Sequence, residues 1–183
     1  MKTKTPLQTI CRYVIFVLLI PSFVLAGSVK TYVGKNINFA DYHTYTWLPT
    51  KVLTNKGIVE DDPVGGPIIR SAINEELTSR GLKEVPSGGD LQVATIVLTG
   101  YSPQLEAYLF AGGWAGTEWG SSTATLGRYN KDGTLGVNLI DSRTNKSAWA
   151  GMITESIDNK KGGNEKKIPP AAKKLFSKYP IKK

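Results

Sequence analysis

The stretch that decides the fold of this chain is TLGVNLIDSRTNKSAWAGMI, residues 134–153. Apolar side chains alternate along residues 134–140, and a second strand pattern follows at residues 147–153, as in strands with one buried face. Residues 141–146 between them are polar and predict a turn. The stretch therefore predicts an antiparallel hairpin.

A third antiparallel strand is expected just upstream. Residues 123–129 lead into Asn130-Lys131-Asp132-Gly133, where Asp-Gly can take the positive φ values of a tight turn. Further upstream, residues 90–98 are apolar on both faces, which predicts a central strand. β-branched and aromatic residues at 29–33 and 44–47 predict two short strands.

Two stretches follow the helical period. Apolar residues within 68–77 recur at spacings of one, three and four, with Pro67 in the first turn and Gly81 as the left-handed stop. Residues 168–179 repeat the pattern and end before Pro180. The polar, Gly/Pro-bearing residues 50–66 predict a loop. This order predicts an α+β fold, with a mainly antiparallel sheet and two helices packed on one face.

The N-terminus has the pattern of an export signal. Lys2, Lys4 and Arg12 carry positive charge without an acidic residue, and an apolar run of about 13 residues follows. A membrane-spanning helix needs roughly 20 apolar residues, so the pattern favours a signal peptide. We assign residues 1–27 to the signal peptide and residues 28–183 to a single α+β domain that is exported to the periplasm.

The positive charge of the chain is concentrated near its C-terminus. The whole chain has 23 Lys and Arg against 15 Asp and Glu, a formal net charge of +8. Residues 28–156 hold 11 basic and 13 acidic groups, net −2, whereas residues 157–183 hold nine lysines and two acids, net +7. Export and the lack of a recognition motif argue against nucleic-acid binding. The Lys-rich helix predicted at 168–179 either is simply solvated or makes peripheral contact with anionic lipid head groups.

Residues 38–47, NFADYHTYTW, carry the most distinctive motif, an Asp/Phe turn leading into Thr-Tyr-x-Trp. The motif resembles the opening signature of a bacterial envelope family, domain of unknown function 4136 (DUF4136). Further matches follow in order over almost the whole domain: Glu76-Leu77 to Gly81-Leu82, Asp90-Leu91-Gln92-Val93, the Gly/Trp-rich segment, Gly133-Thr134-Leu135, Leu139-Ile140-Asp141, Trp149-Ala150-Gly151 and Leu175 to Pro180.

The resemblance implies a location more than a reaction. Members of that family look like exported lipoproteins of Gram-negative envelopes without assigned catalytic residues. Leu25-Ala26-Gly27 reads like the start of a lipobox, but Ser28 stands where the lipid-bearing cysteine belongs. This departure favours a soluble periplasmic protein over an outer-membrane-anchored one.

The sequence predicts no catalytic, cofactor or metal site. The only cysteine, Cys11, lies in the predicted signal peptide, and the only histidine, His43, is interpreted as a partly exposed residue at a strand edge beside Asp41. The acidic cluster Glu60-Asp61-Asp62 lacks the spacing of a calcium loop and is interpreted as solvated or as favouring a nearby helix N-terminus. The glycines of residues 112–116 lack the dinucleotide-binding pattern.

The Gly/Trp-rich segment near residues 108–122 is the candidate binding region. Its aromatic side chains either stack on an envelope protein, a glycan or a lipid, or fold back over the sheet and complete the core; they are Tyr108, Phe110, Trp114 and Trp119. The first functional hypothesis is therefore a noncatalytic envelope protein that serves as a binding or assembly module. The alternative is a glycan- or cell-wall-acting hydrolase that uses carboxylates. The sequence does not indicate the ligand or the oligomeric state.

Overall fold

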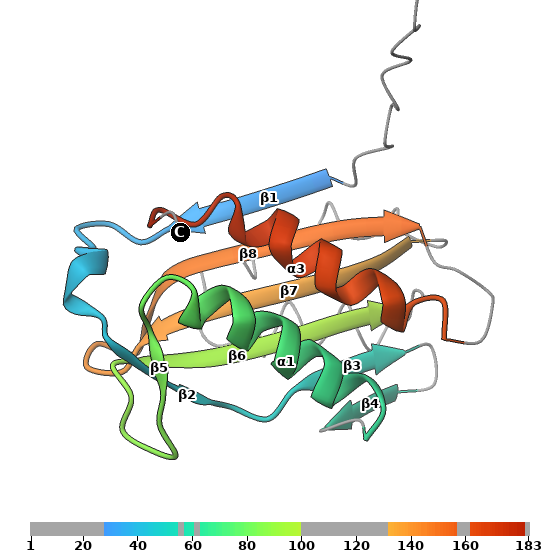
Figure 1. Ribbon diagram of the computed structural model, residues 1–183, viewed down its shortest axis with the longest axis horizontal. Coiled ribbons are helices and arrows are strands. Elements are labelled where there is room, and N and C mark those ends of the chain that lie inside the picture. Colours follow the sequence, from blue (N-terminus) through green and yellow to red (C-terminus); the bar gives the residue numbers. More distant parts are fainter. Residues whose placement is uncertain (1–27, 55–56, 61–62, 100–131, 157–161, 182–183) are drawn as a thin grey trace, which may run out of the picture.

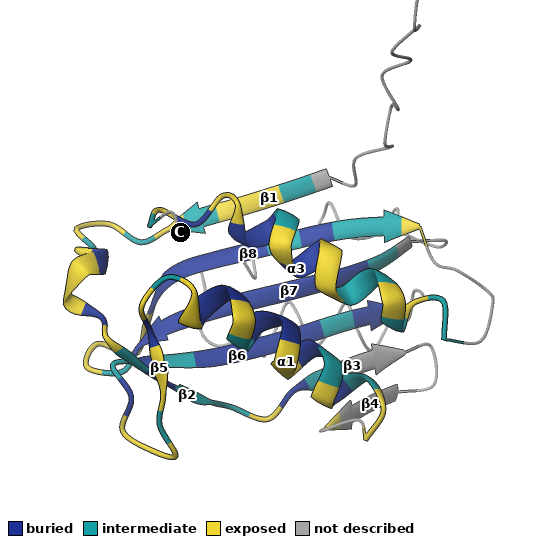
Figure 2. Cartoon of the chain, in the orientation of Figure 1, coloured by how far each residue is buried: buried dark blue, intermediate teal, exposed yellow. Residues whose placement is uncertain are grey.

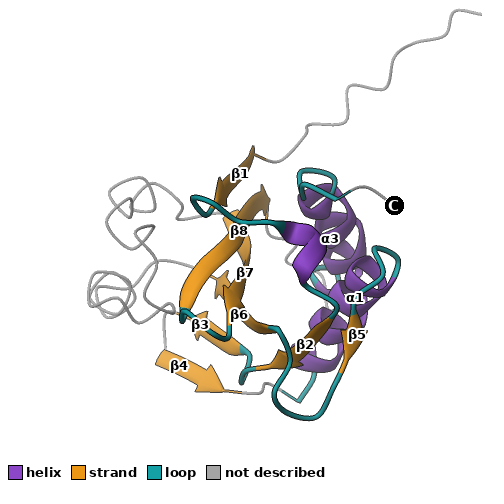
Figure 3. Ribbon diagram, turned by 90° about the vertical axis from the view of Figure 1, so that its left-hand side faces the viewer, coloured by secondary structure: helices purple, strands orange, loops and turns teal. Residues whose placement is uncertain are grey.

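Two helices cover one face of a mixed β-sheet (Figures 1 and 3). The computed structural model describes residues 28–54, 57–60, 63–99, 132–156 and 162–181. The strands are β1 (Ser28–Val33), β2 (Thr44–Trp47), β3 (Lys51–Thr54), β4 (Gly57–Glu60), β5 (Lys83–Glu84), β6 (Leu91–Thr99), β7 (Asp132–Asp141) and β8 (Lys146–Ser156). The helices are α1 (Gly65–Thr78) and α3 (Ile168–Phe176), with short 3₁₀ turns η1 (Phe39–Asp41) and η3 (Glu165–Lys167).

The sheet is antiparallel through its long strands and parallel at one side. Its main path runs β1-β8-β7-β6-β2-β5, and β3 pairs with both β4 and β6. The strands β6, β7 and β8 pair antiparallel along almost their whole length, whereas β2 and β3 both run parallel to β6. The predicted α+β fold with its antiparallel hairpin is confirmed, and the sheet is mixed rather than purely antiparallel.

The core lies between the helices and the sheet (Figure 2). Trp149 of β8 is fully buried, and its ring lies 5.2 Å from that of Phe176 on α3. Gly151, two residues further along β8, must stay small, because a Cβ there would lie 2.7 Å from both Leu175 Cδ1 and the Trp149 ring. The predicted packing of both helices on one face is confirmed.

The end of α1 follows the predicted chemistry. Gly81 has φ +90°, a conformation that glycine adopts without a Cβ clash. Its N–H donates to the Thr78 carbonyl at 3.0 Å, and the Leu82 N–H donates to the Leu77 carbonyl at 3.2 Å. These two bonds form a Schellman motif, which brings Leu82 back into the core beside Leu77.

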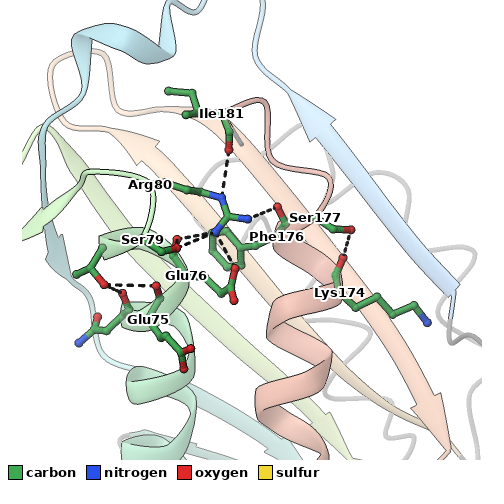
Figure 4. Close-up of polar contacts among 10 residues, drawn as sticks. Glu75, Glu76, Ser79, Arg80, Lys174, Phe176, Ser177 and Ile181 are labelled. Atoms are coloured by element: carbon green, nitrogen blue, oxygen red, sulfur yellow. Dashed lines mark hydrogen bonds and ion pairs between the residues drawn. The ribbon is translucent and has the colours of Figure 1, made fainter. Parts of the chain in front are cut away.

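Arg80, just before that glycine, ties the ends of the two helices together (Figure 4). Its guanidinium donates to Glu76 Oε2 at 2.7 Å and to the carbonyls of Glu76, Phe176 and Ile181 at 2.6, 2.8 and 3.2 Å. It also lies over the Phe176 ring, 5.5 Å from the centroid. The cation therefore adds hydrogen bonds to backbone carbonyls at the end of α1 and at and beyond the end of α3, and so connects the two helix ends.

The predicted loop at residues 50–66 is wrong, because β3 and β4 form a hairpin there. The four pairs run from Lys51 with Glu60 to Thr54 with Gly57. Each strand is only four residues long and lacks a clear alternation of its own. Parallel pairing of β3 with residues 96–99 of β6 stabilises it, which is a tertiary effect that local composition does not encode.

Two predicted boundaries also differ. Asp132 and Gly133 do not form a tight turn but belong to β7, where they pair with Ser156 and Glu155 of β8. The register with β8 therefore overrides their turn preference, and the strand predicted at 123–129 lies outside the described residues. Helix α3 ends at Phe176, earlier than predicted, because its last carbonyls bond in tight turns, with Tyr179 N–H donating to Phe176 O at 3.0 Å.

Candidate functional site

A groove of about 590 Å³ lies where the segment between β1 and η1 faces the turn between β7 and β8. Tyr42 and Asp141 lie at its buried base. The exposed side chains of Lys35, Arg143 and Lys146 line it. The groove thus joins the first loop of the domain to a turn about a hundred residues later in the chain.

Asp141 anchors the base of the groove. Its Oδ1 accepts the backbone N–H groups of Arg143 and Thr144 at 2.8 and 2.9 Å, which folds the turn after β7 around the carboxylate. Its Oδ2 accepts the Tyr42 hydroxyl at 2.7 Å and Arg143 Nη2 at 3.1 Å. The carboxylate therefore accepts four hydrogen bonds, two on each oxygen.

These bonds determine the protonation states at the base. Burial alone would raise the pKa of Asp141, but the hydrogen bonds from Tyr42, Thr144 and Arg143 outweigh it and hold that pKa well below its ordinary value. Burial, together with the hydrogen bond to the Asp141 carboxylate, raises the pKa of Tyr42 to about 12. At neutral pH the pair is therefore a phenol donating to a carboxylate.

The rim of the groove is cationic. The Arg143 side chain is 70% exposed, and its guanidinium lies 5.9 Å from the centroid of the Tyr42 ring. Lys35 and Lys146 are also exposed. Asp41 faces the same groove, and its Oδ1 accepts Asn38 Nδ2 at 2.8 Å. Three cations thus surround two carboxylates that are each already hydrogen-bonded.

Other residues of the 38–47 motif hold the fold together. Asp90 Oδ2 accepts the His43 and Thr44 N–H groups and the Thr44 hydroxyl, all at 2.9 Å, which fixes the start of β2 beside β6. Asn74 Oδ1 of α1 accepts the Tyr45 hydroxyl at 2.9 Å and Trp47 Nε1 at 3.0 Å. The motif is therefore largely explained by structure, and only its first half reaches the groove.

The candidate residues from the sequence are not among the described residues that line this groove. Tyr108, Phe110, Trp114 and Trp119 lie outside the described residues, as do Asp61 and Asp62 of the acidic cluster. Glu60 forms an ion pair with Lys51 at 3.3 Å. His43 is exposed and precedes β2, and its backbone, rather than its side chain, bonds to Asp90.

Sequence reasoning missed Lys35, Tyr42, Arg143 and Lys146 as site residues. The turn of residues 141–146 was expected only as a polar connection. Its Asp-Ser-Arg-Thr-Asn composition is typical of an Asp-capped turn, and in the structure Asp141 Oδ1 does accept the Arg143 and Thr144 N–H groups. Asn145 closes the turn with φ +55°, a conformation that Asn tolerates, and its N–H donates to the Asp141 carbonyl. The contact between Tyr42 and Asp141 has no local signal, because 99 residues separate them.

Asp141 at the base of the groove is poorly suited to acid–base chemistry. A carboxylate with a strongly lowered pKa has no proton to donate at neutral pH, and the four bonds to Asp141 occupy its acceptor positions. The described part of the chain contains no group of three or more His, Cys, Asp or Glu side chains that could hold a metal. None of its helices is long and apolar enough to cross a bilayer.

Solved structures show the same fold in other proteins. A DUF4136 family protein from Bacteroides thetaiotaomicron is 15% identical, with a TM-score of 0.59 over 85% of this chain and 96% of that one. A PDZ domain protein from Parabacteroides distasonis is 17% identical, with a TM-score of 0.57 over 86% of this chain and 36% of that one. None of the curated proteins matches the chain. The family model described as a domain of unknown function (DUF4136) matches residues 29–181, so the chain belongs to the DUF4136 family.

Proposed function

We propose that this protein is a noncatalytic binding module of the bacterial cell envelope, and that its groove binds an acidic envelope component. The observation that carries the proposal is the arrangement of the exposed cations Lys35, Arg143 and Lys146 around a buried, fully hydrogen-bonded carboxylate, Asp141. The hydrogen bonds to Asp141 keep the floor of the groove in place, while the cations at the rim attract the negative charges of a ligand.

The chemistry of the rim favours carboxylate or phosphate groups. Arg143 keeps one guanidinium contact to Asp141 Oδ2 and is otherwise exposed, so other N–H groups of its fork can face a ligand. The exposed residues Asn36 and Asn38 add neutral polar groups along the same wall. Charged and neutral donors side by side suit an acidic glycan, with Tyr32 adding an aromatic surface.

The proposed location rests on the N-terminus. Lys2, Lys4 and Arg12 before an apolar run support export, and Ser28 at the position of a lipobox cysteine supports a soluble periplasmic form. Determining the N-terminus of the native protein and its distribution between soluble periplasm and outer membrane tests this point. Retention in the cytoplasm would contradict the location.

Calorimetric titration of the mature protein, purified after export, tests the groove. We expect an oligogalacturonate hexamer to bind and maltohexaose, which has the same length and no charge, not to bind. Replacing Lys35 and Arg143 by Gln should lower the affinity at least ten-fold. The matched control is the double variant Lys30→Gln with Lys83→Gln, which removes two exposed charges outside the groove. Its affinity for the acidic hexamer should stay near that of the wild type.

Three results would contradict the proposal: no binding of the acidic hexamer, equal binding of both hexamers, or equal losses in the two double variants. Release of shorter saccharides during the titration would contradict its noncatalytic part and favour the hydrolase alternative. The Gly/Trp region stays a separate prediction. Replacing Trp114 and Trp119 by Ala should abolish co-purification with envelope components while the thermal midpoint is kept, and unchanged recovery would refute it.

A further inference from the structure

Helix α3 separates its apolar and basic residues. Ala171, Ala172, Leu175 and Phe176 are buried against the sheet and α1. The exposed residues of this region include three lysines, Lys166 in η3, Lys173 in α3 and Lys178 just beyond it. In Figure 2 the exposed positions of α3 alternate with buried ones along the helix, and in Figure 4 the half-buried Lys174 extends away from the helix axis. We call Lys166, Lys173 and Lys178 the lysine face.

This face is strongly one-signed. Residues 162–181 contain five lysines and one acid, Glu165. The neighbouring helix α1 differs, because its exposed Arg70 and Glu75 balance each other. The positive charge of the described domain is therefore concentrated on the α3 side of its helical layer rather than spread over both helices.

Helix stability does not explain all of these lysines. Lys173 lies in the last turn of α3, where a cation favours the helix dipole. Lys166 precedes the N-terminus of α3, where a cation is unfavourable, and Lys178 follows the end of the helix. The neighbouring Lys167 has a structural contact, since its Nζ donates to the Ser156 carbonyl at 2.7 Å. The lysine face therefore carries charge beyond what α3 needs to fold.

We propose that the lysine face docks the domain on a membrane surface that contains anionic phospholipids. These three exposed lysines follow one another through η3, α3 and the residues just beyond it, so a planar layer of head groups at this end of the helical layer can attract them together. Each lysine that reaches such a surface strengthens binding by on the order of five-fold at moderate salt. The interaction is reversible and weakens as salt screens the charges.

Sedimentation of the mature protein with lipid vesicles tests the proposal. We expect binding to vesicles containing phosphatidylglycerol, little binding to pure phosphatidylcholine, and a steep loss as NaCl rises. The pair Lys173→Gln with Lys178→Gln should weaken binding by on the order of 25-fold. The pair Lys30→Gln with Lys83→Gln removes the same net charge from β1 and β5 and should change binding much less.

The outcomes distinguish a local face from overall charge. Equal losses in the two pairs, or no binding to the anionic vesicles at low salt, would overturn the proposal. Binding to isolated peptidoglycan but not to vesicles would overturn it in favour of a polymer ligand. Thermal midpoints of both pairs should stay near wild type, because all four side chains are exposed. None of the four lines the groove, so this test and the saccharide titration fail independently.

Discussion

Two buried carboxylates, Glu76 and Asp141, each pair with an arginine, and the two arginines differ in exposure. The side chains of Glu76 and Arg80 are both 4% exposed. Asp141 is as buried as Glu76, yet its partner Arg143 is 70% exposed. The two carboxylates are therefore equally buried, whereas one arginine is buried and the other is exposed.

The difference shows which cation is committed to structure. Every nitrogen of the Arg80 guanidinium donates to the protein, and its face covers Phe176. Arg143 contributes one side-chain bond to Asp141, whose other three bonds come from Tyr42 and the turn backbone. Removing Arg80 should therefore disturb the fold, and removing Arg143 should disturb the groove surface.

Replacing Arg80 by Ala should give the largest loss of stability. The substitution leaves the Glu76 carboxylate and the Phe176 carbonyl buried without the guanidinium that they contact, and breaking a buried pair from one side costs about 3–5 kcal/mol. Urea unfolding followed by circular dichroism measures it. Arg80→Lys should recover only part of the loss, because an ammonium cannot reproduce the planar fork. A midpoint equal to wild type in Arg80→Ala would refute the structural role.

Replacing Asp141 by Asn should give the second-largest loss of stability. The free energy of unfolding should fall by about 2–3 kcal/mol at pH 7, since the variant loses charge-assisted hydrogen bonds. The pKa of Asp141 is lowered in the folded state, so its contribution is fully present above the ordinary pKa of 3.8 and is lost as the pH falls through the folded value. The gap in unfolding free energy between wild type and variant should therefore narrow from pH 5 downward. A gap that stays constant would contradict the lowered pKa.

The sequence predicted the elements that depend on local chemistry. The helix at 68–77 was predicted, and so was its stop at Gly81, because a Schellman end needs only a few neighbouring residues. The alternation of residues 134–140 likewise predicted the strand β7, but it predicted one buried face, whereas all seven residues are buried in the structure. The hairpin of β3 and β4 could not be predicted, because β3 depends on pairing with β6, and the paired residues are 45 positions apart in the sequence.

The groove was less predictable than the fold. Lys35 and Arg143 have no motif in common, and only the paths of β1 and β8 bring their loops together. The sequence pointed instead to Trp114 and Trp119, because aromatic residues in a glycine-rich segment are a compositional signal. A rim of cations around a distant tyrosine–aspartate pair is a tertiary feature without such a signal.

Replacing Tyr42 by Phe should cost less than either change above. The ring keeps its packing against Phe39, 6.2 Å away, and only the hydrogen bond to the Asp141 carboxylate is lost, which contributes about 1.5 kcal/mol or somewhat more. Tyr45→Phe is the matched control, because its hydroxyl donates to the neutral amide of Asn74 and should contribute about 1 kcal/mol. A larger loss in Tyr45→Phe would indicate that Asp141 gains little from Tyr42.

Replacing Arg143 by Ala should have the smallest effect on stability and should separate the two arginines most clearly. Its exposed guanidinium is screened by water, and the Tyr42 hydroxyl and two backbone N–H groups still hold Asp141 in place. The unfolding midpoint should therefore stay near wild type, while the affinity for an acidic saccharide falls. A destabilisation as large as that of Arg80→Ala would mean that the exposed arginine is as structural as the buried one, and exposure would no longer distinguish the groove from the core.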